Sequence, residues 1–203
     1  MSEYPDDPNN ILIYCNKGNV FRHLGRFEEA LAAYEQAILL DAYNPLPFSS
    51  KGTIFYHLQR YEEALAAYEQ AIFLDAHDPL PYAGKGLIFY RLQRYEEALI
   101  AHEQAILLDP NNPSHYHNKG NTLYGLKRFD EALTTYEQAL QLNPNDDILS
   151  YNRGTTLYRL KRFDEALTAY EQALQISPDD AFVYNGLGNI PRSPALSRGS
   201  HRL

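Results

Sequence analysis

The chain has 203 residues, 44% of them hydrophobic, which is enough to bury a core without help from metals or disulfides. Its single cysteine cannot form an internal disulfide, the N-terminal segment shows no secretory signal, and no apolar run reaches the roughly 18 residues of a membrane span. We therefore expect a cytoplasmic protein with no membrane segment. The net charge of -8 disfavours nucleic acid as a partner, because affinity for phosphates comes mainly from Lys and Arg.

A block of residues recurs along the chain every 34 positions, and it reads YEEALAAYEQAI at 61–72. Such self-similarity is typical of repeat proteins built from stacked units. In chain order we predict an N-terminal lead-in at 1–10, complete repeats at 11–44, 45–78, 79–112, 113–146 and 147–180, a partial sixth repeat or cap helix at 181–190, and a disordered basic tail at 191–203. The tail has two prolines, three arginines and no acid, a composition that does not continue the helical pattern.

Each repeat predicts two amphipathic helices joined by a short turn. In the first repeat the helical spacing of apolar and small residues runs through Tyr14, Gly18, Phe21 and Leu24, and then through Phe27, Ala30, Leu31, Tyr34, Ala37 and Ile38. The pairs Asn44-Pro45 and Asp78-Pro79 place a capping side chain before a proline at the first position of a helix. We therefore expect the first helix of a repeat to begin at such prolines.

Glycine recurs inside the first helix of every complete repeat, at Gly18, Gly52, Gly86, Gly120 and Gly154. A glycine in a helix interior costs about 1 kcal/mol relative to alanine. Its repetition therefore predicts a close approach of two helices. Phosphate binding is a weak alternative, because the sequence has no GxxxxGK[ST] motif and these glycines follow no predicted strand.

The pattern resembles the tetratricopeptide repeat family. In the fourth repeat it consists of Tyr116, Gly120, Leu123, Ala132, Tyr136, Ala139 and Pro144. Departures occur at Ala42 and Ala76, which replace the closing proline, at His102, which replaces the tyrosine, and at Ser150, which replaces the first aromatic residue. The resemblance implies an all-α, right-handed α-solenoid of antiparallel helix pairs, in which first helices line a concave groove and second helices form its convex back.

Two charged columns follow the repeat. Cations stand at Lys17, Lys51, Lys85, Lys119 and Arg153, where the family more often has leucine. Because long stems can lie along apolar surface with the charge at its edge, we interpret them as packing residues with exposed heads rather than as a binding stripe. Carboxylates stand at Glu35, Glu69, Glu103, Glu137 and Glu171, which we interpret as a solvated helix face.

The candidate binding residues lie on the side of each first helix that faces away from the core. Numbering positions from 1 to 34 within a repeat, this side holds positions 2, 5, 9, 12 and 13. The predicted groove residues are Asn19, Arg22, His23, Thr53, Tyr56, His57, Leu87, Tyr90, Arg91, His117, Asn121, Tyr124, Tyr151, Thr155, Tyr158 and Arg159. Tyrosine and arginine are frequent interface anchors. The sequence therefore predicts a scaffold or adaptor that holds a peptide segment or helix of another protein, with apolar and acidic residues; the alternative is that the tyrosines are scaffold at the solvent edge.

One family-specific partner does not fit. Family members that bind the C-terminal carboxylate of a chaperone carry Lys and Asn on one first helix, Asn on the next, and Lys and Arg on the third. In the first three repeats the matching places hold Cys15, Asn19, Ser50, Leu80 and Gly84; from the fourth repeat they hold His117, Asn121, Asn152, Phe182 and Gly186. Neither set has the cations on which carboxylate recognition depends.

Catalytic and metal chemistry are not expected. His115 and His117 are two apart on a helix and do not share a face, and no cysteine pair accompanies His23 and His57. The residues unique to single repeats are scattered, whereas an active site needs a converging set. We therefore predict no enzyme activity, no metal and no cofactor, and we interpret Cys15 as a small packing residue.

Two other classes of function stay open. The array could be a structural protein that assembles with itself through its C-terminal end, where the last repeat is incomplete. It could also be a helical-repeat RNA binder of the pentatricopeptide kind, although such a protein would need a basic groove with base-reading residues.

Overall fold

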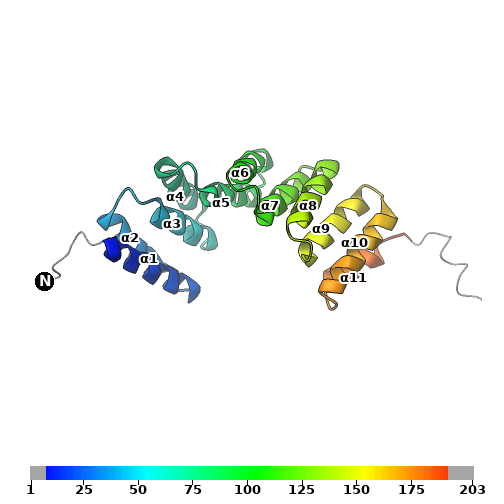
Figure 1. Cartoon of the computed structure of the whole chain (residues 1–203), viewed down its shortest axis with the longest axis horizontal. Helices are drawn as coiled ribbons and strands as arrows, with labels where there is room; N and C mark the ends of the chain where they lie inside the picture. The colour runs from blue at the N-terminus through cyan, green and yellow to red at the C-terminus, as the bar shows by residue number, and fades with distance from the viewer. Residues whose placement is uncertain (1–7, 192–203) are drawn as a thin grey trace, which may run out of the picture. The chain divides into compact units, whose positions relative to one another are not determined.

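The computed structural model describes residues 8–191, and within this range it consists of eleven α-helices and no strand. The helices are α1 (Pro8–His23), α2 (Phe27–Leu40), α3 (Pro45–His57), α4 (Tyr61–Leu74), α5 (Pro79–Arg91), α6 (Tyr95–Leu108), α7 (Pro113–Gly125), α8 (Phe129–Leu142), α9 (Asp147–Arg159), α10 (Phe163–Ile176) and α11 (Ala181–Gly188). Each expected repeat holds two of them, and Figure 1 shows them as successive helix pairs. The all-α prediction is confirmed.

The helix starts follow the capping residues. The side chain of Asn44 accepts a 3.0 Å hydrogen bond from the amide of Leu46, and that of Asp78 accepts one of 2.9 Å from Leu80. Helix α1 begins at Pro8, so it includes the last three residues of the expected lead-in. Of the expected tail, only Pro191 lies among the described residues.

The helices form two compact units. Unit 1 ends at Pro110 and holds α1 to α6, and unit 2 begins at Asn111 and holds α7 to α11. Within each unit a first helix packs on the second helix of its own repeat, which in turn packs on the next first helix. Consecutive first helices also contact one another in each unit, whereas none of the described second helices contacts the next second helix. The first helices of a unit are therefore its inner elements.

The repeated glycines make room for a tyrosine ring of the second helix. A Cβ atom added to Gly52 would lie 2.6 Å from the ring of Tyr68, and one added to Gly84, on the next first helix, would lie 2.3 Å from it. Tyr68 is buried between the two helices. In the third repeat His102 takes the place of this tyrosine against Gly86. The close approach predicted from the glycines is therefore present, and its physical reason is that an aromatic ring occupies the space that a Cβ atom would need.

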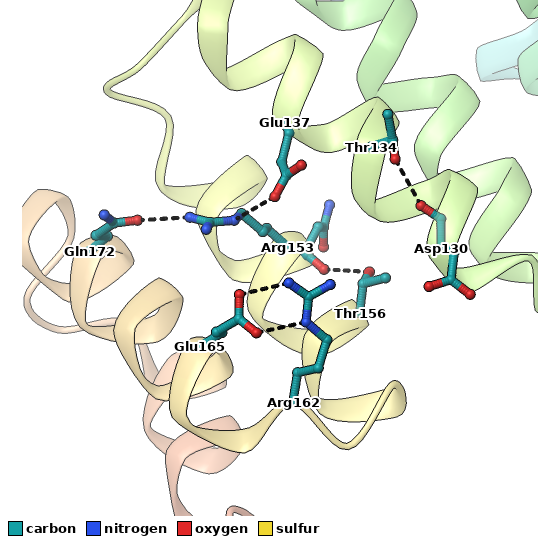
Figure 2. Close-up of polar contacts among 9 residues, drawn as sticks. Asp130, Thr134, Glu137, Arg153, Thr156, Arg162, Glu165 and Gln172 are labelled. Carbon is teal, nitrogen blue, oxygen red and sulfur yellow. Dashed lines mark hydrogen bonds and ion pairs between the residues drawn. The ribbon is translucent and has the colours of Figure 1, made fainter.

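The cation column makes ion pairs between consecutive repeats. Lys51 Nζ lies 3.0 Å from Glu35 Oε1, and Lys85 Nζ lies 2.9 Å from Glu69 Oε1. In unit 2, Arg153 Nε lies 3.6 Å from Glu137 Oε1 (Figure 2). These partly exposed pairs contribute about 0 to 1 kcal/mol each. The ammonium groups of Lys51 and Lys85 also lie over phenylalanine rings, 5.8 and 6.0 Å from the ring centroids. Part of the glutamate column that we interpreted as a solvated face is thus ion-paired.

Candidate protein-interaction site

The tyrosines of position 12 stay partly open to solvent on the inner helices. Tyr56, Tyr90, Tyr124 and Tyr158 are all half-buried, and each packs against the aromatic residue that begins the second helix of its own repeat. The ring centroids are 5.2 Å apart for Tyr124 and Phe129 and 6.2 Å apart for Tyr56 and Tyr61. Each ring therefore packs against its own repeat, while the residue stays partly exposed to solvent.

The residues of position 13 reach back over the preceding repeat. Arg91 Nε donates a 3.3 Å hydrogen bond to the hydroxyl of Tyr56 in unit 1. This hydrogen bond raises the pKa of Arg91. In unit 2, Arg159 Nε donates a 3.1 Å hydrogen bond to the hydroxyl of Tyr124. His57 stacks on the ring of Phe27, with 5.9 Å between ring centroids. A basic side chain and a ring from neighbouring repeats thus form one surface element.

The polar residues of position 9 are already engaged within the protein. The hydroxyl of Tyr34 donates a 2.8 Å hydrogen bond to Asn19 Oδ1, and that of Tyr136 donates one of 2.7 Å to Asn121 Oδ1. Thr53 and Thr155 lie 3.2 Å from the hydroxyls of Tyr68 and Tyr170 respectively. We call the side of the first helices that carries positions 2, 5, 9, 12 and 13 the first-helix face. These contacts hold its position 9 side chains in place, and they leave fewer hydrogen-bonding atoms for a partner than the sequence suggests.

A polar cluster lies on the inner helices of unit 2. Asn152 Nδ2 is 2.9 Å from His117 Nε2, and Asn121 Nδ2 is 3.2 Å from the same atom, so two amide groups converge on one imidazole nitrogen. Burial lowers the pKa of His117, against an opposing effect of Asp146. Asn152 is absent from the predicted groove residues; its only signal in the sequence was its match to one asparagine of the carboxylate-binding pattern.

A cavity of about 180 Å³ opens on the same face of unit 2. Its lining combines residues of α7, α9 and α11, the C-cap residue of α11 and one tyrosine of α10: Tyr124, Tyr151, Thr155, Tyr158, Arg159, Tyr170, Phe182, Asn185, Gly186 and Asn189. The structure therefore brings together several predicted residues of unit 2 and completes their site with the partial sixth repeat. The contribution of α11 was missed, although Asn185 and Asn189 occupy the same repeat positions as Tyr151 and Thr155.

The predicted groove residues fall into two sets. Unit 1 holds Asn19, Arg22, His23, Thr53, Tyr56, His57, Leu87, Tyr90 and Arg91, and unit 2 holds His117, Asn121, Tyr124, Tyr151, Thr155, Tyr158 and Arg159. An apolar column at position 2 was also missed. Its exposed members are Leu12, Leu46 and Leu80 in unit 1 and Ile148 and Phe182 in unit 2. The signal was available, because apolar residues recur there on the side that faces away from the core.

Other chemistry is limited in the described part of the chain. Within residues 8–191 no three His, Cys, Asp or Glu side chains are grouped so that they could hold a metal ion. None of the described helices is long and apolar enough to cross a membrane. Cys15, a residue of α1, is buried, and this burial raises the pKa of its thiol, as expected for a small packing residue.

Comparison with known proteins gives the family. Models of the tetratricopeptide repeat match residues 11–44 and 117–181, and a further model of the same repeat matches 52–93 and 86–127. The sequence matches no curated protein.

Solved structures share the fold at low sequence identity. YrrB, described as a tetratricopeptide repeat protein with an unusual peptide-binding site, is 22% identical with a TM-score of 0.72, over 90% of this chain and 94% of that chain. The pilF protein of Pseudomonas aeruginosa is 21% identical with a TM-score of 0.79, over 86% of this chain and 80% of that chain. MamA of Desulfovibrio magneticus RS-1 is 17% identical with a TM-score of 0.75, over 85% and 97%. With the helix pairs, the glycine and tyrosine packing and the family models in agreement, the chain belongs to the tetratricopeptide repeat family.

Proposed function

We propose that this protein is an adaptor that holds an extended segment of another protein on the first-helix face of unit 2. Tetratricopeptide repeat proteins are scaffolds for protein interaction, and this chain has their architecture. The observation that carries the proposal is the cavity formed by α7, α9, α10 and α11, whose lining includes five residues that the sequence alone assigned to the groove. A cytoplasmic location remains a prediction.

The size of the cavity favours a single side chain as its occupant. Sites for small molecules enclose about 300 to 1,000 Å³, and this cavity encloses about 180 Å³. Tyrosine rings and Phe182 supply apolar walls, whereas Asn185 and Asn189 supply amide groups that can bind a peptide backbone. The cavity is therefore suited to one apolar anchor residue of a peptide that continues along the inner helices.

The charge at the cavity favours an acidic neighbour for that anchor residue. The guanidinium of Arg159 lies over the rings of Tyr124 and Phe129, 5.9 Å from each centroid, so its position is ordered before any partner binds. A carboxylate of the partner would gain a charge-assisted hydrogen bond from an arginine that is already in place. We thus propose a segment with an apolar residue next to an acidic one. The peptide-binding site named for YrrB is consistent with this class of partner.

Selection of peptides tests the proposal. A library of random displayed peptides would be panned on the immobilised protein, and enriched peptides would be measured by titration calorimetry. Tyr124→Ala should lower the affinity of the protein for these peptides by about tenfold or more, as expected for an anchor residue. Tyr90→Ala, in unit 1, reports whether the other first-helix face takes part.

The matched control is Gln138→Ala, an exposed residue of α8 outside the cavity. Circular dichroism would confirm that each variant keeps its helices. Peptides that bind all variants alike, or a library that yields no binder, would overturn the proposal.

A second candidate function is self-assembly through the C-terminal end. Phe182 and Tyr184 are both exposed on α11. Light scattering over a series of protein concentrations tests it: a molar mass that does not rise with concentration speaks against assembly.

A further inference from the structure

A second exposed surface lies on the outer helices of unit 1. Near the ends of α2, α4 and α6, Leu39, Phe73 and Leu107 occupy the same repeat position and expose 77%, 82% and 73% of their area. Two turns earlier on the same helix face stand Ala32, Ala66 and Ile100, also exposed. We call these six residues the outer stripe. They contribute one pair of apolar residues to each repeat of unit 1.

Unit 2 shows that the fold does not require this stripe. The same two positions hold Thr134 and Gln141 in α8, and Thr168 and Gln175 in α10, which are all exposed. The helices are otherwise closely alike, with the sequences YEEALAAYEQAIFL for α4 and FDEALTTYEQALQL for α8. Because polar residues support the same helix in unit 2, the apolar residues of unit 1 have no role in folding that the structure shows.

The last repeat of unit 1 adds a depression beside the stripe. It encloses about 480 Å³ between α5 and α6, and Ile100 forms part of its wall together with the aromatic residues Tyr82 and Phe89. Ile100 itself is 68% exposed. A large apolar side chain that crosses the stripe at this repeat therefore has a site that it can enter.

The charges around the stripe select the kind of partner. Helices α2, α4 and α6 each carry three glutamates and no lysine or arginine. Several of these glutamates are ion-paired with cations outside the three helices: Glu28, Glu29, Glu63 and Glu97 with the arginines that precede α2, α4 and α6, and Glu35 and Glu69 with lysines of the next first helix. Glu62 and Glu96, one turn before the first stripe position of their helices, are exposed. Like charges repel, so these helices disfavour an anionic membrane or the same face of a second copy. Lysine and arginine at the edges of a partner helix would instead meet opposite charge.

We propose that the outer stripe binds a basic amphipathic helix of a partner protein. The apolar face of that helix covers Leu39, Phe73 and Leu107, its largest side chain enters the depression beside Ile100, and its cationic edges lie near the exposed carboxylates of Glu62 and Glu96. An amphipathic helix on an apolar groove is a recurrent mode of recognition. This surface is separate from the first-helix face, so the protein would hold two partners, or two segments of one partner, on opposite helices of its repeats.

A synthetic peptide tests the proposal. The probe is a fluorescein-labelled 18-residue peptide of leucine and lysine with its leucines on one helical face, followed by fluorescence anisotropy at physiological salt. The test variant combines Leu39→Gln, Phe73→Gln and Leu107→Gln. Each repeat of unit 1 then carries the glutamine that unit 2 has at the same repeat position. Its affinity for the probe should fall by about tenfold or more, because three apolar contacts are lost. A scrambled peptide of the same composition has no apolar face. It should bind the unsubstituted protein no more tightly than the probe binds the triple variant.

Controls separate this surface from the proposed peptide site. Tyr56→Ala with Tyr90→Ala alters the first-helix face of unit 1 and should leave binding of the probe unchanged. If the triple variant does not keep its helical circular dichroism, Phe73→Gln alone makes the same comparison. Equal affinity of the stripe variant and the unsubstituted protein overturns the proposal, and so does equal binding of the scrambled peptide, which would mean that charge alone is recognised. Dimerisation that the stripe variant abolishes would also overturn it, with a second copy as the occupant.

Discussion

Arg159 donates a hydrogen bond of 3.1 Å from Nε to the hydroxyl of Tyr124, thirty-five residues earlier in the chain. In unit 1, Arg91 makes the same contact with Tyr56 at 3.3 Å. A cation at position 13 thus orients the ring at position 12 of the preceding repeat, and the two positions act together instead of as separate columns. Ordering these side chains before binding lowers the entropy that a partner would otherwise have to remove.

Substitution of a core glycine should destabilise unit 2. A Cβ atom at Gly120 would lie 2.5 Å from the ring of Tyr136, which is buried and held through its hydroxyl by Asn121. The ring has little room to move aside, so Gly120→Ala should lower the free energy of unfolding by about 1 to 3 kcal/mol, less the roughly 1 kcal/mol that alanine gains in a helix. Urea denaturation followed by circular dichroism measures it. Gly188→Ala, where nothing lies within 4 Å, is the control, and a Gly120→Ala protein as stable as this control would show that the ring yields.

The stability of unit 2 should depend on pH through His117. Burial lowers the pKa of His117 below its ordinary value of 6.5, so the folded protein favours the neutral imidazole. The contribution of this residue is therefore fully present above the unfolded pKa and is lost as the pH falls through the lower folded pKa. Between pH 7.5 and 5 the urea midpoint should fall more in the unsubstituted protein than in His117→Gln, whose amide oxygen can still accept from Asn121 and Asn152. Parallel pH profiles for the two proteins would mean that His117 does not carry the effect.

Removal of the cap of α11 should loosen the wall of the cavity. The side chain of Asp180 accepts hydrogen bonds from the amides of Phe182 at 2.8 Å and Val183 at 3.4 Å. Loss of such a cap costs about 1 kcal/mol, and α11 has only eight residues. In Asp180→Ala, amide hydrogen exchange should therefore become faster in α11 and stay unchanged in α7 and α8. The neighbouring exposed Asp179→Ala is the control, and equal exchange in the two variants would contradict the capping role.

The repeating part of the fold could be predicted because each repeat contains its own signals. The period, the asparagine or aspartate before a helix, and the glycine inside it are local features, and the structure places the helix of Pro45 and the packing of Gly52 accordingly. Position 9 shows the limit of this reasoning. The sequence places Asn121 on the open side of its helix, whereas the hydroxyl of Tyr136 on the neighbouring helix occupies its amide oxygen. Whether a polar atom is still available depends on residues from another helix, which periodicity does not report.

The sequence by itself determined the all-α class, the helix pairs and the faces on which tyrosine and arginine stand, because helical spacing decides which residues share a side. Only the tertiary structure decided which of those residues meet. It divided the helices into two compact units between Pro110 and Asn111, joined Lys51 to Glu35 across repeats, and closed a cavity with α11. These features depend on how one repeat packs on the next, a three-dimensional relation between side chains far apart in the chain that identical local patterns leave open.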